Sequence, residues 1–240
     1  TATAGRETLL LVEDNDAIRE ISAQALRRRG YTVFEARNGE EAIAFADLAL
    51  RETLPSTQDA EVRLGIAGMF AISPEIRISA GRLALSLPDL SQTLRARHLA
   101  CLFHNLVTAG RVDEGRAMLE EARAAAASAD DARASFTLQV AESALDYTDD
   151  RFGPSLQLIT SAYRDGIFAG DDQRLRLAHM WHGELLSIAD RDEEALAIAA
   201  DGLAAAQRDR QGWAYQMFET WHGRMLLRTG RLTEARADER

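Results

Sequence analysis

The chain has 240 residues, of which 46% are hydrophobic and 28% charged, a balance typical of a folded protein with a buried core. All 28 basic residues are arginine and the net charge is −10, so nucleic acid is excluded as the expected main partner, as is any mechanism that needs a lysine amine. Cys101 is the only cysteine, which excludes an intrachain disulfide and favours a cytoplasmic location. No apolar run reaches the roughly 20 residues of a membrane span, and the first residues lack the features of a signal peptide. Because the sequence starts without methionine and stops inside a helical pattern, we expect it to be part of a longer chain.

The first fifty residues predict alternating strands and helices. Thr8–Val12 is an apolar run of strand length, and Asp14–Arg29 carries apolar residues at helical spacing. Tyr31–Glu35 alternates as a second strand, and Asn38-Gly39 turns into a second helix. Strand, helix, strand and helix at this spacing predict the opening of an α/β domain with a parallel sheet.

This segment resembles the receiver domain of two-component response regulators and hybrid sensor kinases. The motifs "LLLVEDN" and "GYTVFEARNGEEA" carry the resemblance, which covers about residues 7–47. It implies a flavodoxin-like fold in which an acidic pair after the first strand binds magnesium for phosphoryl transfer to an aspartate. Glu13 and Asp14 match that pair, and carboxylates at a strand end are suitable ligands for a hard cation.

The match to a receiver stops after residue 47. A receiver continues with a third strand that ends in the phosphoacceptor aspartate, and a later strand carries a lysine. Asp59 lies at nearly the expected distance, but Pro55-Ser56-Thr57-Gln58 precedes it instead of an apolar strand, and the chain has no lysine. We therefore expect at most weak magnesium binding at Glu13 and Asp14, no other cofactor and no catalytic residues. Phosphorelay through a magnesium-assisted phospho-aspartate is the alternative function.

Residues 1–50 thus form a truncated receiver-like segment, joined by a linker at 51–58 to a helical domain at 59–240. Two strands are too few to stand alone, and the first strand would leave an edge unpaired. We expect this segment either to pack on the first helices of the following domain or to pair with a second copy through its first strand, which would give a homodimer.

The remainder of the chain repeats every 40 residues. Arginines follow predicted turns at Arg111, Arg151, Arg191 and Arg231, and small residues that would allow close helix packing recur four positions later: Gly115, Ser155, Ala195 and Ala235. Such a period is typical of a solenoid of helical hairpins. The first helices of the hairpins are predicted at 92–108, 131–147, 172–189 and 212–228, and the second helices at 112–127, 154–168, 192–208 and 232–240. A less regular pair is predicted at 59–72 and 74–87.

Two tryptophans share one phase of this repeat. Trp181 and Trp221 each begin a Trp-His-Gly sequence, and an apolar residue at helical spacing is usually part of a core. We predict that each indole packs between its hairpin and the next. The following histidines, His182 and His222, should be partly buried. Glycine within a helix costs about 1 kcal/mol relative to alanine, which suggests close helix crossings at Gly183 and Gly223.

The repeated region is similar to the tetratricopeptide-like arrays of large ATP-binding LuxR-type transcriptional regulators. The 40-residue period and turns such as Gly230-Arg231 with Glu234-Ala235 carry this resemblance over about residues 59–240. In that family the array lies between an ATPase module and a DNA-binding module, and receives signals from effectors or partner proteins. This sequence shows neither a phosphate-binding loop of the P-loop type nor a recognition helix.

Two groups of potential metal ligands occur on the predicted first helices. His98 and Cys101 share a helix face, but His104 lies about 240° away from His98, so core packing is the preferred interpretation. His179 and His182 could meet His222 across adjacent hairpins, although partial exposure in the array is the simpler prediction.

The sequence therefore predicts a mainly α fold: an α-α solenoid of tetratricopeptide-like hairpins with a small partial α/β segment at its N-terminus. The predicted function is a non-enzymatic signal-transduction scaffold, a fragment of a transcription regulator. A protein partner or small effector would bind in the solenoid groove, lined by exposed residues of the first helices. No membrane or nucleic-acid partner is expected for this chain, and the identity of the residues that contact the partner is left open.

Overall fold

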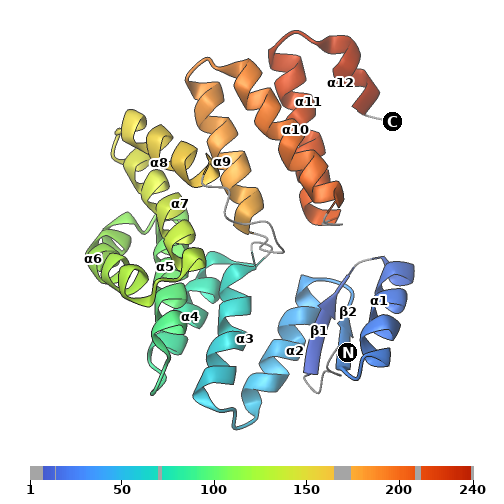
Figure 1. Ribbon diagram of the computed structural model, residues 1–240, viewed down its shortest axis with the longest axis vertical. Helices are drawn as coiled ribbons and strands as arrows, with labels where there is room; N and C mark the ends of the chain where they lie inside the picture. Colours follow the sequence, from blue (N-terminus) through green and yellow to red (C-terminus); the bar gives the residue numbers. More distant parts are fainter. Residues whose placement is uncertain (1–7, 14, 70–71, 165–173, 209–211, 239–240) are drawn as a thin grey trace.

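The computed structural model describes all residues except 1–7, 14, 70–71, 165–173, 209–211 and 239–240. It begins with a βαβα segment, and every later element in the described ranges is a helix, in an arc that runs from α3 to α12 (Figure 1). The prediction of a mainly α fold with a small α/β segment is therefore confirmed. The N-terminal elements are β1 (Thr8–Val12), α1 (Asp16–Arg28), β2 (Thr32–Ala36) and α2 (Gly39–Arg51).

The sheet pairs β1 with β2 in parallel, with Leu10 opposite Phe34. On β2, Val33 and Ala36 are buried, whereas Leu10 and Phe34 are 42% and 48% exposed. The Phe34 ring lies 5.5 Å from the ring of Phe45 on α2, so this helix covers part of the face that the two exposed side chains share. The described part of the sheet has two strands, as the truncated receiver pattern predicts.

Several helices begin where a side chain can satisfy their first backbone N–H groups. Asn15 accepts hydrogen bonds from the backbone N–H groups of Ala17 and Ile18, so α1 begins at Asp16, two residues later than predicted. Asp131 caps α7 in the same way through the N–H of Ala134. Ser73 caps α4, whose first residue, Pro74, needs no hydrogen-bond partner for its nitrogen.

The repeated region consists of helical hairpins at the predicted positions. The first pair is α3 (Ser56–Gly68) with α4 (Pro74–Leu85), three residues earlier at its start than expected. The 40-residue units are α5 (Gln92–Thr108) with α6 (Val112–Ala129), α7 (Ala132–Thr148) with α8 (Phe152–Arg164), α9 (Arg174–Ile188) with α10 (Asp192–Arg208), and α11 (Gly212–Arg228) with α12 (Leu232–Asp238). The predicted ends of α8, α9 and α12 that fall at 165–168, 172–173 and 239–240 lie outside the described residues.

One turn conformation joins the two helices of each 40-residue unit. Residues 110, 150, 190 and 230 all have positive φ, between 56° and 77°: Gly110, Asp150, Asp190 and Gly230. The next residue, an arginine, donates its backbone N–H to a carbonyl five positions earlier, as in Arg111 to Leu106 and Arg231 to Leu226. A positive φ followed by this hydrogen bond is typical of the Schellman motif, which satisfies the last carbonyls of one helix before the next begins.

The recurring small residues lie where the two helices of a hairpin approach each other. Gly115, Ser155, Ala195 and Ala235 are all buried. A β-carbon on Gly115 would lie 3.1 Å from Cγ2 of Val107, a tighter contact than most side chains tolerate. The prediction that these positions allow close packing is confirmed.

The N-terminal segment is continuous with the core of the array. Ala46 and Leu50 of α2 pack against a buried cluster formed by Ile66, Ala67, Ala80 and Cys101. The linker is shorter than the predicted residues 51–58: α2 ends at Arg51 and α3 begins at Ser56, so residues 52–55 join the two helices.

Candidate functional site

The end of β1 holds the first of the two predicted magnesium ligands. Glu13 Oε1 accepts a hydrogen bond of 3.0 Å from the backbone N–H of Asn15, and the backbone oxygen of Glu13 accepts one of 2.8 Å from Arg19. Arg19 also pairs with Asp16 and lies 3.8 Å from a carboxylate oxygen of Glu35. The carboxylate of Glu13 therefore helps to order the start of α1, beside a guanidinium whose charge disfavours a cation. Asp14, the second predicted ligand, lies outside the described residues.

Asp59, the residue nearest to the phosphoacceptor position in the sequence, occupies the first turn of α3. Its Oδ1 accepts a hydrogen bond of 2.5 Å from Nε of Arg63, one turn later in the same helix. Both side chains are mostly buried, at 15% and 17% exposure. Asp59 is thus a helical ion-pair partner and does not follow a strand, which is the position that receiver chemistry requires of its acceptor.

His98 and Cys101 of α5 belong to the core, whereas His104 is half-buried. His98 is fully buried, with Nε2 at 2.9 Å from the carbonyl oxygen of Ala60. Cys101 is 3% exposed and its thiol lies 3.5 Å from the carbonyl oxygen of Ala67. Across the described ranges no group of three histidine, cysteine or acidic side chains is placed to hold a metal ion, so neither His98, Cys101 and His104 nor the histidines of α9 and α11 form a metal site there.

His182 is buried at 5% exposure, whereas partial burial was predicted for it; His222 is half-buried as predicted. Nε2 of His182 lies 3.1 Å from Oγ1 of Thr160. The hydroxyl of Thr160 donates its own proton to the carbonyl oxygen of Leu156. Nε2 must therefore carry the ring proton, which leaves Nδ1 as a buried acceptor with no hydrogen-bond partner among the described residues. Burial, together with the nearby charges of Arg191 and His179, lowers the pKa of His182 to about 4.

Trp181 and Trp221 pack on the preceding hairpin, not between their own hairpin and the next. Trp181 on α9 donates its indole N–H to Oγ of Ser143 on α7, at 2.9 Å. Its ring also makes an edge-on contact with Tyr147, with centroids 5.2 Å apart. Ser143 donates in turn to the backbone oxygen of Ser155 on α8, and Ser155 Oγ donates back to the backbone oxygen of Ser143. This buried exchange joins α7, α8 and α9.

Trp221 on α11 packs against Gly183 on α9, and its indole N–H donates to Glu184 at 3.0 Å. A β-carbon on Gly183 would lie 1.8 Å from Cη2 of Trp221, so only glycine leaves room for the ring. The predicted close approach at Gly183 is therefore confirmed, but it is the side chain of Trp221, and not the backbone of a crossing helix, that lies against the glycine. The corresponding prediction for Gly223 is wrong, because no described atom lies within 4 Å of a β-carbon placed there.

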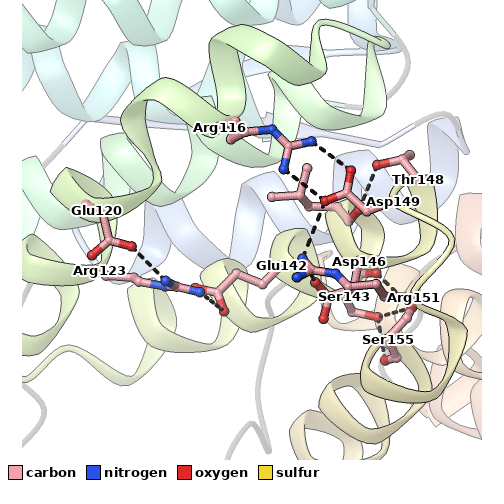
Figure 2. A network of polar contacts seen from close by, with 11 residues as sticks. Arg116, Glu120, Arg123, Glu142, Ser143, Asp146, Thr148, Asp149, Arg151 and Ser155 are labelled. Carbon is pink, nitrogen blue, oxygen red and sulfur yellow. Dashed lines mark hydrogen bonds and ion pairs between the residues drawn. The ribbon is translucent and has the colours of Figure 1, made fainter.

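Arginine–carboxylate pairs link α6 to α7 and to its C-terminal end (Figure 2). Arg116 makes two hydrogen bonds to Asp149, and Arg123 joins Glu120 to Glu142 on the next helix. Hydrogen bonds from Arg116 lower the pKa of Asp149, so the carboxylate stays ionised well into acid. Exposed pairs of this kind stabilise by at most about 1 kcal/mol each, so they fix the orientation of neighbouring helices more than they stabilise the fold.

A shallow hollow of about 450 Å³ lies where α4, α5 and α6 meet. Leucines of α4 and α5 and Met118 of α6 supply its apolar lining: Leu85, Leu99, Leu102 and Leu106 are the leucines. Its polar residues form two ion pairs, Arg82 with Glu114 at 2.5 Å and Arg95 with Glu121 at 2.6 Å. Two of its three helices, α4 and α6, are second helices of their hairpins, whereas the solenoid groove is predicted to be lined by exposed residues of the first helices.

An apolar lining with paired charges is suited to an amphipathic partner, whose apolar side chain would fill the hollow while its polar groups meet the ion pairs. Sequence reasoning missed these residues because they come from three helices. Arg82, Glu114 and Glu121 look like ordinary solvated helix positions until the packing of α4 beside α6 is known.

Comparisons with known proteins bear on a short part of the chain. A stretch of 43 residues, 18% of this chain, is 54% identical to the sensor kinase CckA of Brucella abortus (strain 2308). The stretch covers 5% of that protein, so the chain spans only a small part of the relative that it matches. No family model matches the chain, and no solved structure matches it. In the described part of the chain, every helix is too short or too polar to cross a bilayer. The chain is thus similar in one segment to a signalling protein.

Proposed function

We propose that this chain is a non-enzymatic scaffold of cytoplasmic signal transduction, whose helical array binds a protein partner. The similarity to a sensor kinase supports a link to two-component signalling. We infer that the matched stretch is the βαβα segment, because its length is close to that of residues 8–51 and the receiver motifs lie there. A place in a LuxR-type transcription regulator is a proposal that rests on the period and turns of the array.

The observation that carries the proposal is the packing of α2 on the array. In a complete receiver this helix would cover a five-stranded sheet, whereas here Ala46 and Leu50 contact the buried cluster of α3, α4 and α5. The βαβα segment therefore serves as an N-terminal cap that shields the apolar face of the first hairpin, as terminal units of helical arrays do. Pairing of β1 with a second copy is a separate proposal, which sedimentation over a range of concentrations tests.

The hollow between α4, α5 and α6 is the proposed contact with the partner. Leu85 and Met118 offer its apolar area, because Leu99, Leu102 and Leu106 are at most 5% exposed. Each 100 Å² of apolar surface removed from water contributes about 2.5 kcal/mol before the costs of association. The ion pairs of Arg82 and Arg95 would orient the partner through its polar groups. A partner helix with an apolar side chain flanked by charges of both signs fits this chemistry.

The alternative function is phosphorelay through a phospho-aspartate, and the sensor-kinase similarity is the finding that favours it. Two features weigh against it: Asp59 is paired with Arg63 inside α3, and Glu13 is engaged at the start of α1. The lysine that a receiver carries on a later strand is also missing, because the chain has no lysine.

Selection from a phage-displayed library of helix-forming peptides tests the scaffold proposal. Ala117 lines the hollow and is exposed, so Ala117→Arg fills the hollow without disturbing the core. Ala127→Arg is the matched control, since Ala127 is exposed on the same helix and is not part of the lining. We expect most peptides selected on the unmodified protein to lose binding to Ala117→Arg and to keep binding to Ala127→Arg. Peptides that bind all three proteins equally would refute the hollow as the contact surface.

A further inference from the structure

The hollow between α4, α5 and α6 has a counterpart two units further along the array, between α8, α9 and α10. The turns at Arg111 and Arg191 fix the register, because each arginine follows a residue with positive φ and directly precedes a second helix. Residues of the two units therefore correspond at an offset of 80 in the sequence. Five residues that line the hollow have these counterparts: Leu99 with His179, Leu102 with His182, Ala117 with Ala197, Met118 with Ile198, and Glu121 with Asp201.

In the later unit, a tyrosine of α8 occupies the counterpart of the hollow. The ring of Tyr163 lies 5.1 Å from the ring of His179 and 5.0 Å from that of His182, centroid to centroid. It also packs against the buried cluster to which Ile198 belongs. Its hydroxyl donates a hydrogen bond of 2.9 Å to Asp201 on α10. The counterparts of the residues at the hollow thus hold a phenol, with its ring on the first helix and its hydroxyl on a carboxylate of the second.

The hollow itself contains no such ring among the described residues that line it. The helix that takes the place of α8 there is α4, which contributes Arg82 and Leu85. Ile198 is only 8% exposed, whereas Met118 at the corresponding position is half-buried. A volume of about 450 Å³ is within the range of cavities that bind small ligands, so one aromatic ring fits in the hollow.

The carboxylate that would receive the hydroxyl is accessible, although it already pairs with an arginine. Glu121 is 54% exposed, and Arg95 donates to its Oε1 at 2.6 Å. An ionised carboxylate has two oxygens with about four acceptor sites, so one arginine does not saturate it. Asp192 shows this combination, since it accepts hydrogen bonds from both the Ser187 hydroxyl and Arg228. Glu121 can therefore accept a hydrogen bond from a phenol while it keeps its pair with Arg95.

We propose that the hollow binds a tyrosine side chain of the protein partner. The ring packs against Leu85, Ala117 and Met118, and the phenol hydroxyl donates to Glu121, as Tyr163 donates to Asp201 in the later unit. This inference rests on the proposed scaffold function and names the side chain by which the hollow recognises its partner.

Two small probes that differ by a single hydroxyl test the proposal: N-acetyl-tyrosinamide and N-acetyl-phenylalaninamide. The protein is labelled with ¹³C in its methionine methyl groups, and the NMR signal of Met118 is identified by its loss in Met118→Leu. We expect both probes to shift this signal in a saturable manner. The tyrosine derivative should bind about fivefold or more tightly than the phenylalanine derivative, because only its hydroxyl can donate to the carboxylate.

The decisive protein variant is Glu121→Ala, which removes the acceptor from an exposed position. The phenylalanine derivative should bind this variant as before, whereas the tyrosine derivative should lose its advantage. Glu120→Ala is the matched control, because Glu120 is 84% exposed on the same helix, pairs with Arg123 and is not part of the lining. This control should keep the advantage of the tyrosine derivative, and Ala117→Arg should abolish the binding of both probes.

Three results would overturn the tyrosine site: no shift of the Met118 signal, equal affinities of the two probes for the unmodified protein, or an advantage of the tyrosine derivative that survives Glu121→Ala. Phage-selected peptides that lose binding to Ala117→Arg but contain no tyrosine would also overturn it, while the scaffold proposal would stand. Peptides that bind Ala117→Arg unchanged would instead refute the hollow as the contact surface of the scaffold, on which the two small probes do not depend.

Discussion

The indole of Trp221 occupies the space that a side chain at residue 183 would need. A β-carbon on Gly183 would lie 1.8 Å from Cη2 and 2.4 Å from Cζ2 of the ring. Trp221 is 3% exposed and belongs to the largest buried cluster of the last two hairpins. A helical glycine, unfavourable on its own, is thus explained by the partner that it admits from the next hairpin.

Gly183→Ala should lower the free energy of unfolding by about 1–3 kcal/mol, because the ring must move out of a packed core. The matched variant is Gly223→Ala, which meets no described atom within 4 Å and should gain about 1 kcal/mol from helix propensity. Urea unfolding followed by circular dichroism measures both. If the two substitutions changed stability in the same direction and to the same extent, the packing of Trp221 on Gly183 would be incorrect.

In the turns of the 40-residue units, introducing a glycine and replacing a glycine should have opposite effects on stability. Asp150 has a φ of 58°, a conformation that costs a non-glycine residue about 1 kcal/mol, so Asp150→Gly should stabilise the protein by about that amount. Gly230→Ala should destabilise it similarly, although a β-carbon there has open space. Thermal unfolding of both variants tests the shared left-handed turn, and a stabilising Gly230→Ala would contradict it.

His182 makes stability depend on pH in mildly acidic solution. Its pKa is lowered to about 4 in the folded protein, while an unfolded histidine titrates near pH 6.5. Between these values the unfolded chain binds a proton that the folded chain does not, so stability falls as the pH falls from about 6.5 to about 4. This loss of stability reaches about 3 kcal/mol in acid, and it vanishes above pH 6.5.

The variant His182→Gln isolates this effect, because glutamine can still donate to Thr160 but does not titrate. The free energy of unfolding, measured by urea titration at several pH values, should fall less steeply with acid in the variant than in the unmodified protein. Parallel pH profiles would show that His182 is not held neutral in the folded state.

The exchange between Ser143 and Ser155 should stabilise the junction of three helices. Ser143→Ala removes the donor to the Ser155 carbonyl and the acceptor for Trp181, which leaves buried polar groups without partners. A loss of about 1–3 kcal/mol in the free energy of unfolding is expected. Ser128→Ala is the control, since Ser128 is exposed near the end of α6, and its effect should stay within about 0.5 kcal/mol. Equal effects of the two substitutions would argue against the buried exchange.

The sequence allowed most helix boundaries to be predicted, because turns and caps are local. The arginine after the positive-φ residue of each 40-residue unit, the small residue four positions later and the serine or aspartate caps all act within one turn of chain. The start of α1 is an exception: the side chain of Asn15 caps this helix, so it begins two residues later than predicted.

Relations between hairpins could be predicted only in part. The shared phase of Trp181 and Trp221 indicated core positions, but the hairpin that each indole contacts depends on how the array stacks. Gly223 has the same local sequence as Gly183 and differs only in lacking an occupant among the described residues. His182 and the hollow were missed for the same reason, since their burial and lining come from helices far apart in the sequence.

Treatment of the full chain with acetyl phosphate and Mg²⁺, followed by intact-mass measurement, tests most directly whether the receiver-like segment acts as a cap instead of a phosphoacceptor. Because Asp59 is paired with Arg63 in α3 and α2 packs on the array, the predicted result is no phosphoryl adduct, with or without magnesium. A magnesium-dependent adduct that is released by hydroxylamine and maps to an aspartate of the first sixty residues would contradict the scaffold proposal and establish phosphorelay.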